Sequence, residues 1–190
     1  MIKRITFGVP VVSPTPPVRV VRCVALPDLT PDPFAEVVTV EWFETPLGAG
    51  SLAGDEGDLG DVVIEEHVVR GLEWLDARWR DDGDRFKHMA FARRAPSLTV
   101  AEFASRWRSH AGTLGGASIP EEIKGRAYAQ NLPVPRAAGE WPFDAVNEVW
   151  FDDLDGLRRR VEWFQQYHEP TGDDLFGPSV FLAVRETVVR

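Results

Sequence analysis

The chain has 190 residues, 44% of them hydrophobic and 27% charged, which is enough to bury a core and ordinary for a globular protein. Its formal net charge of −9 argues against nucleic acid and anionic membrane surfaces as partners, because phosphate groups repel an acidic chain. No apolar run approaches the roughly 20 residues of a membrane helix. The single cysteine, Cys23, cannot form an internal disulfide, which is typical of a reducing compartment. We therefore expect a cytoplasmic protein with no nucleic-acid or membrane partner.

The first part of the chain is rich in β-branched residues and prolines. Alternating apolar residues and proline-rich breaks predict four strands, at residues 2–12, 18–26, 34–44 and 62–69. Apolar residues at helical spacing predict one short helix at residues 71–79. Residues 46–60 combine glycine, alanine and acidic residues, so we expect a mobile surface loop there.

An acidic turn at residues 81–84 is the predicted boundary between two units. The second unit, residues 85–190, reads as strand, helix, strand, strand, helix, strand. Its first helix is the clearest, because Thr99 and Glu102 form a capping-box pattern ahead of an apolar stripe that we expect to reach Leu114. This order is typical of an α+β, ferredoxin-like fold, in which one antiparallel sheet carries two helices on one face. Residues 1–84 are interpreted as a degenerate β-rich half that packs on the second sheet.

The second unit also contains an ordered series of short motifs. They are Met89–Arg94, Leu98–Phe103 with Trp107 and His110-Ala111 after it, Tyr128–Asn131, Phe143–Phe151 and Glu186. In this order they resemble an EthD-like domain of the dimeric α+β barrel superfamily. The resemblance implies that two such sheets pack face to face into a barrel, either as a pseudo-dimeric barrel within one chain or in a homodimer. It also implies a kinship with small enzymes of aromatic and polyketide metabolism.

Four residues of these motifs have side chains that can do chemistry. His110 lies on the apolar stripe of the first helix of this unit and can move a proton near neutral pH, because a histidine has an ordinary pKa of about 6.5. Asp144 and Glu148 lie four apart on one predicted strand, so both point to the same face, where a carboxylate can orient an imidazole. Tyr128 can hold a substrate oxygen. We therefore predict catalytic roles for these four side chains.

Plainer interpretations of the same residues stay open. His110 and Tyr128 can be packing residues, and the two carboxylates can face solvent or pair with Arg93 or Arg126. Four further residues are predicted to bind the substrate, although the aromatic ones suit a core equally well: Phe103, Trp107, Asn131 and Trp150. The histidines show no tight metal-ligand spacing and the sequence has no phosphate-binding loop, so we expect neither metal nor cofactor.

The sequence favours a small cofactor-independent enzyme. Its partner would be a hydrophobic or aromatic, polyketide-like small molecule, and its chemistry an acid/base proton transfer in a cyclisation, dehydration or isomerisation. One alternative is a cofactor-free monooxygenase that uses the carbanion of its own substrate. The other is a non-catalytic accessory protein that binds a hydrophobic pathway product.

Overall fold

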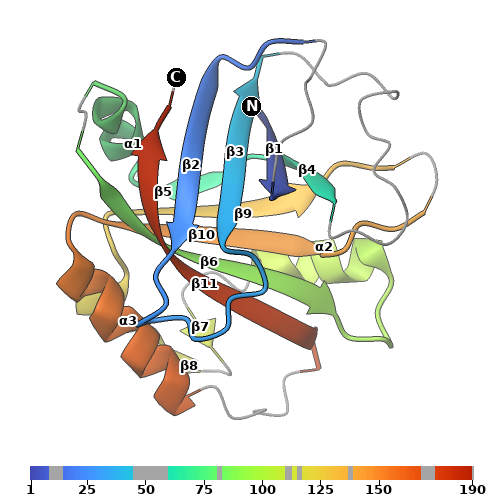
Figure 1. Ribbon diagram of the computed structural model, residues 1–190. Coiled ribbons are helices and arrows are strands. Elements are labelled where there is room, and N and C mark those ends of the chain that lie inside the picture. Colours follow the sequence, from blue (N-terminus) through green and yellow to red (C-terminus); the bar gives the residue numbers. More distant parts are fainter. Residues whose placement is uncertain are drawn as a thin grey trace.

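The computed structural model describes residues 1–8, 15–44, 60–80, 83–109, 113–114, 117–136, 139–167 and 174–189. Within them, eight strands form one closed antiparallel barrel (Figure 1). The strands are β1 (Ile2–Phe7), β2 (Arg19–Ala25), β3 (Val37–Phe43), β4 (Asp61–Glu65), β6 (Arg85–Arg94), β9 (Ala127–Pro133), β10 (Ala145–Phe151) and β11 (Phe176–Val188).

Smaller elements lie outside this ring. They are the short strand β5 (Val68–Arg70), which extends the sheet beside β9, the hairpin pair β7 (Thr113–Leu114) and β8 (Ala117–Ser118), and the 3-10 turn η2 (Glu121–Ile123). The helices of the described residues are α1 (Leu72–Arg78), α2 (Val100–Arg108) and α3 (Leu154–Tyr167). No helix among the described residues is both long and apolar enough to cross a bilayer.

The strand order repeats between the two halves of the barrel. Around the ring the order is β4-β1-β3-β2 and then β11-β6-β10-β9, and β10 is hydrogen-bonded to both β6 and β9. In each half the fourth strand lies beside the first, the first beside the third and the third beside the second. Two antiparallel pairings join the halves, β2 with β11 and β4 with β9.

The predicted α+β ferredoxin-like fold of the dimeric α+β barrel type is wrong. The chain forms one closed eight-stranded β-barrel, with three short helices in the described residues. One physical reason lies on the outer face of the first half, where Arg4 on β1 is ion-paired to Glu41 on β3 at 2.6 Å between Nη2 and Oε2. A face covered by paired polar side chains does not need a helix to bury it. Because the edges of both halves are paired with each other, none of the eight barrel strands in the described residues leaves a free edge for a second sheet.

Several predicted elements differ in extent from those observed. The strand expected at 62–69 is divided into β4 and β5, with Glu66 and His67 between them. Helix α2 has the predicted capping box of Thr99 and Glu102 but ends at Arg108, and Leu114 belongs to β7. The predicted loop at 46–60 lies outside the described residues except for Gly60.

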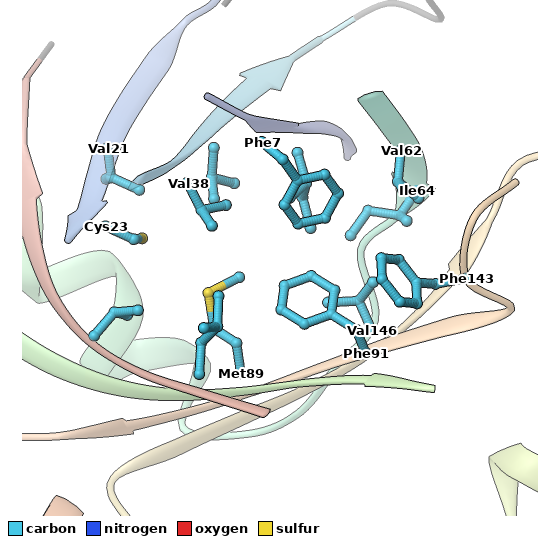
Figure 2. Close-up of a cluster of buried hydrophobic side chains, with 14 of the residues drawn as sticks. Phe7, Val21, Cys23, Val38, Val62, Ile64, Met89, Phe91, Phe143 and Val146 are labelled. Atoms are coloured by element: carbon cyan, nitrogen blue, oxygen red, sulfur yellow. The ribbon is translucent and has the colours of Figure 1, made fainter. Parts of the chain in front are cut away.

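The barrel interior is filled by apolar side chains over most of its length (Figure 2). Inward positions alternate along each strand, so that Ile5 and Phe7 of β1 and Met89 and Phe91 of β6 face the same core. Phe7 and Phe91 meet with ring centroids 5.3 Å apart, and Phe143 contacts both. A core packed with large rings holds the strands in one register, because a one-residue slip would turn those rings outward.

Candidate functional site

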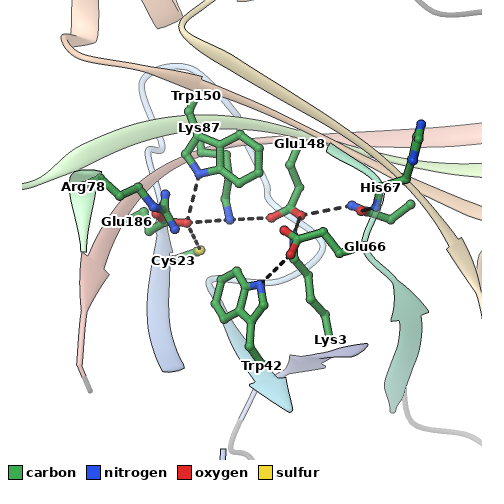
Figure 3. A network of polar contacts seen from close by, with 11 residues as sticks. Lys3, Cys23, Trp42, Glu66, His67, Arg78, Lys87, Glu148, Trp150 and Glu186 are labelled. Carbon is green, nitrogen blue, oxygen red and sulfur yellow. Dashed lines mark hydrogen bonds and ion pairs between the residues drawn. The ribbon is translucent and has the colours of Figure 1, made fainter. Parts of the chain in front are cut away.

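One end of the barrel is lined by charged side chains instead of apolar ones (Figure 3). Lys3 continues the inward series of Ile5 and Phe7, and Lys87 continues that of Met89 and Phe91. Glu148 of β10 and Glu186 of β11 complete the lining. All four side chains are at most 1% exposed, so their charges have been removed from water almost completely.

These groups form a chain of ion pairs. Glu148 accepts a hydrogen bond from each of two lysines. Its Oε2 lies 2.5 Å from Lys3 Nζ, and its Oε1 lies 2.8 Å from Lys87 Nζ. Lys87 Nζ also lies 2.7 Å from Oε2 of Glu186, whose Oε1 is ion-paired to Arg78 of α1. The chain of pairs therefore crosses from β1 through β10, β6 and β11 to the helix.

A third carboxylate, Glu66, lies 2.7 Å from Lys3 Nζ and is 15% exposed, which makes it the most solvent-accessible member of the set. We call these six residues the interior ion network: Lys3, Glu66, Arg78, Lys87, Glu148 and Glu186. It contains three cations and three carboxylates. Each carboxylate also accepts from a neutral side chain: Glu66 from Trp42 Nε1 (3.2 Å), Glu148 from Asn131 Nδ2 (3.1 Å) and Glu186 from Trp150 Nε1 (3.4 Å).

The pKa values of Glu148 and Lys87 are set by competition between burial and the opposite charges around them. Burial alone would raise the pKa of Glu148, but Lys3 and Lys87 outweigh it and hold that pKa at about 2. Burial would lower the pKa of Lys87, but Cys23, Glu148 and Glu186 raise it above its ordinary value. Burial raises the pKa of the Cys23 thiol to about 12. Glu148 and Lys87 therefore supply fixed charges and Cys23 stays a neutral thiol, so none of the three is a proton donor or acceptor poised near pH 7.

A second polar group lies on the outer face of the same strands, beneath α3. Arg160 of α3 is 6% exposed and donates from Nε to Nδ1 of His88 on β6 at 3.2 Å, and from Nη1 to the carbonyl oxygen of Ile123 at 2.9 Å. Tyr128 of β9 packs on this side of the sheet and shares a side-chain hydrogen bond with Asn147 of β10. We call His88, Tyr128, Asn147 and Arg160 the outer-face cluster.

Aromatic rings enclose the outer-face cluster. His88 is stacked on Phe181 of β11 with centroids 5.4 Å apart, and Phe164 of α3 lies 5.2 Å from the imidazole. The Arg160 guanidinium lies 4.5 Å from the Phe164 centroid. The cluster thus combines one buried cation with a largely apolar wall, a pairing typical of sites for small organic ligands.

The titration of the outer-face cluster follows from that burial. Burial lowers the pKa of Arg160 to about 9, with Arg70 adding to the effect. Burial, and then the charge of Arg160, hold the pKa of His88 well below its ordinary value. Burial raises the pKa of Tyr128 to about 12. At neutral pH the cluster therefore contains a cationic Arg160, a neutral imidazole and a protonated phenol.

The residues predicted to be catalytic are not gathered in one place by the described part of the structure. Glu148 faces the barrel interior, whereas Tyr128 belongs to the outer face. Asp144 precedes β10, accepts from the backbone N–H of Arg94 at 2.9 Å and is ion-paired to the Arg94 side chain. His110 lies outside the described residues, so its role stays a prediction.

The predicted substrate-binding residues are divided in the same way. Asn131 and Trp150 donate hydrogen bonds to two carboxylates of the interior ion network, Glu148 and Glu186 respectively. Phe103 and Trp107 are stacked on one another beneath α2, with Phe176 against both rings. Those two rings pack as a core between helix and sheet.

Sequence reasoning missed Lys3, Lys87 and Arg78 in the interior and His88 and Arg160 outside. A signal for the interior lysines exists, since each lies two and four residues before two apolar inward positions of its strand. Arg78 stands three residues after the buried Leu75 and so shares its helix face. Arg160 lies in the run Arg158-Arg159-Arg160, which on its own favours a solvated helix face.

Two comparisons with known proteins identify no relative of this chain. No family model matches the chain, and no curated protein matches it. Neither comparison identifies an EthD-like domain.

Replacing Glu148 by Gln tests the interior ion network. The change keeps the shape but leaves Lys3 and Lys87 without a shared anion, so we expect a loss of about 3–5 kcal/mol in the free energy of unfolding. Urea unfolding at pH 7 measures it. The matched control is Glu121→Gln, which removes a surface carboxylate 2.7 Å from Lys124 and should cost less than about 1 kcal/mol. Equal losses in the two variants would contradict a buried network.

Acid titration tests the burial of His88. Because its folded-state pKa is depressed, the unfolded chain takes up the proton first as the pH falls. The stability that neutral His88 contributes is therefore present above about pH 6.5 and is lost progressively below it. The difference in unfolding free energy between wild type and His88→Gln should shrink from pH 7.5 to pH 5, with His67→Gln as the matched histidine control. A pH-independent difference would contradict the assignment.

Proposed function

We propose that the protein is a cofactor-independent enzyme that transfers a proton on an aromatic or polyketide-like small molecule, with the outer-face cluster as its site. The observation that carries the proposal is the environment of Arg160. This buried guanidinium donates to an imidazole nitrogen and a carbonyl oxygen, both neutral, and forms no ion pair with a carboxylate of the described residues. A buried cation without an anion is unfavourable by several kcal/mol, and a ligand that brings negative charge would relieve it.

An oxyanion formed during proton transfer is the kind of charge that this arrangement suits. Removing a proton beside a carbonyl group turns the carbonyl into an enolate, whose oxygen carries the new charge. Tyr128 stays protonated at neutral pH and can donate to that oxygen, while Arg160 neutralises it. Preorganised donors of this kind are often the largest contribution to such a reaction. Phe164 and Phe181 supply an apolar wall for the rest of an aromatic substrate.

His88 acts in this proposal as a positioning residue and not as the base. Its Nδ1 accepts from Arg160 Nε, so the lone pair of that nitrogen is already engaged and the guanidinium is held against the sheet. The sequence predicts His110 as the acid or base of the reaction, and this proposal gives it the role of the base. It follows Trp107 by three residues, and the carbonyl oxygen of Trp107 accepts from Gln130 Nε2 of β9 at 2.5 Å. That contact brings the end of α2 to the strand that carries Tyr128.

A hydrogen–deuterium exchange assay tests the function without knowledge of the natural reaction. Wild-type protein in D2O is incubated with a panel of hydroxylated aromatic ketones and 1,3-diketones, and exchange of the C–H beside each carbonyl is followed by NMR. We expect saturable catalysis on part of the panel. Tyr128→Phe should lower the exchange rate by about two to three orders of magnitude, the scale for one oxyanion donor. Tyr167→Phe, the same change at the other tyrosine of the chain, is the control.

The alternatives give different results in the same experiment. Oxygen uptake with the panel would indicate the monooxygenase, and saturable binding with neither exchange nor oxygen uptake would indicate the accessory protein. Exchange that is equal in wild type and Tyr128→Phe would contradict the proposed site. His110→Asn should keep the fold and lower turnover by about two orders of magnitude or more if His110 is the base.

A further inference from the structure

We propose that a small monocarboxylate binds at the end of the barrel that holds the interior ion network. Its two oxygens would accept hydrogen bonds from the edge of the Arg78 guanidinium that does not face Glu186. Arg78 is 3% exposed and directs Nη1 at Glu186. Its Nε and Nη2 atoms are buried and have no hydrogen-bond partner among the described residues. This site is distinct from the outer-face cluster, so the proposal of carboxylate binding does not depend on the proposed function.

The two unpartnered nitrogens have a geometry that selects the ligand. Nε–H and Nη2–H point in parallel from one edge of the planar guanidinium, and their spacing matches the two oxygens of a carboxylate. A buried donor without an acceptor costs about 1–3 kcal/mol, so leaving two on one side chain favours an acceptor that fits both. The Nε1 atom of the neighbouring Trp79 is a third buried donor without a partner in the described residues.

The walls of the site are indoles. The Arg78 guanidinium lies 4.2 Å from the Trp79 ring centroid and 5.3 Å from that of Trp150. Trp42 meets Trp79 edge to face, with centroids 5.2 Å apart. Trp79 is partly exposed, so this is the side on which a ligand can reach Arg78 from solvent.

The local charge favours one negative charge and not two. The interior ion network is balanced, three cations against three carboxylates. A fourth cation, Arg19 of β2, lies 4.7 Å from the Trp79 centroid, so both Arg19 and Arg78 are stacked on that ring. No carboxylate of the described residues is ion-paired to Arg19. One bound monocarboxylate would neutralise this excess, whereas a dianion would exceed it.

Titration calorimetry and tryptophan fluorescence with sodium acetate, sodium benzoate and inorganic phosphate test the site. The titrations use the full chain at pH 7 and constant ionic strength, with chloride as the replaced anion. We expect saturable binding of acetate or benzoate, a change in tryptophan emission, and weaker binding of phosphate. Arg78→Lys keeps a cation for Glu186 but removes the two parallel N–H donors of the guanidinium edge. It should therefore weaken carboxylate binding by about tenfold to a hundredfold. Arg106→Lys, at an exposed arginine ion-paired to Asp174, is the matched control.

Two further variants keep the test decisive if Arg78→Lys does not fold. Trp79→Phe retains a ring but removes the unpartnered N–H, and should weaken binding several-fold. Arg160→Lys distinguishes the two sites. If this variant loses carboxylate binding and Arg78→Lys keeps it, the carboxylate binds in the outer-face cluster and the assignment is overturned. Absence of saturable binding at about 100 mM of both carboxylates would also overturn the assignment. Ordered water would then be the acceptor for Nε and Nη2 of Arg78.

Discussion

The closed barrel depends on the burial of the interior ion network. Lys3, Lys87, Glu148 and Glu186 come from four different strands, and Arg78 adds the helix α1 to the same set of contacts. Removing an ion from water costs several kcal/mol, and the cost is offset only when every partner is in place with good geometry. Opening the barrel on either side of β6 would separate Lys87 from Glu148 or from Glu186. Opening the barrel there would therefore leave buried charges without their partners.

The alternation of the strands divides the chemistry of the molecule into two environments. Lys87 faces inward while its neighbour His88 faces α3, and Glu148 faces inward while Asn147 faces the outer cluster. The interior holds paired charges, and the pKa values of Glu148 and Lys87 lie far from neutrality, which suits support and anion recognition. The outer face holds a cation with no counterion among the described residues, a protonated phenol and aromatic rings, which suits stabilisation of a charge that appears during a reaction. A rigid interior would then position the outer-face cluster through the same strands.

Local patterns in the sequence predicted most elements but not their assembly. The apolar alternation of β1 and β3 and the capping box of Thr99 are decided by residues close in sequence, and the structure has these strands and this helix. The pairings of β2 with β11 and of β4 with β9 join residues far apart in the chain, and no local pattern contains them. The ferredoxin-like prediction failed at this step, because the order of elements in the second half was interpreted without these edge pairings.

The candidate site was harder to predict than the fold, for reasons visible at single residues. Asp144 and Glu148 were expected on one face of one strand, but β10 begins at Ala145, so Asp144 lies before the strand and binds Arg94. Side chains alternate between the two faces only inside a strand. The residue at which an element begins is the feature that a sequence predicts least precisely. Arg160 could not be separated from Arg158 and Arg159 without knowing which side of α3 meets the sheet. Glu148 was selected, but as a partner of His110 and not of two buried lysines.

The pKa of Glu148 tests the central claim most directly. Carbon-13 NMR of the Glu148 side-chain carboxyl, assigned by comparison with Glu148→Gln, follows its ionisation in the folded protein as the pH is lowered. A network buried between Lys3 and Lys87 predicts that this carboxyl keeps its charge through the usual range of glutamate titration, with a midpoint at about 2 or unfolding before it is reached. A titration midpoint near the ordinary glutamate value of about 4.3 in the folded protein would contradict the account, because it would mean that the charges at this end of the barrel are hydrated and independent.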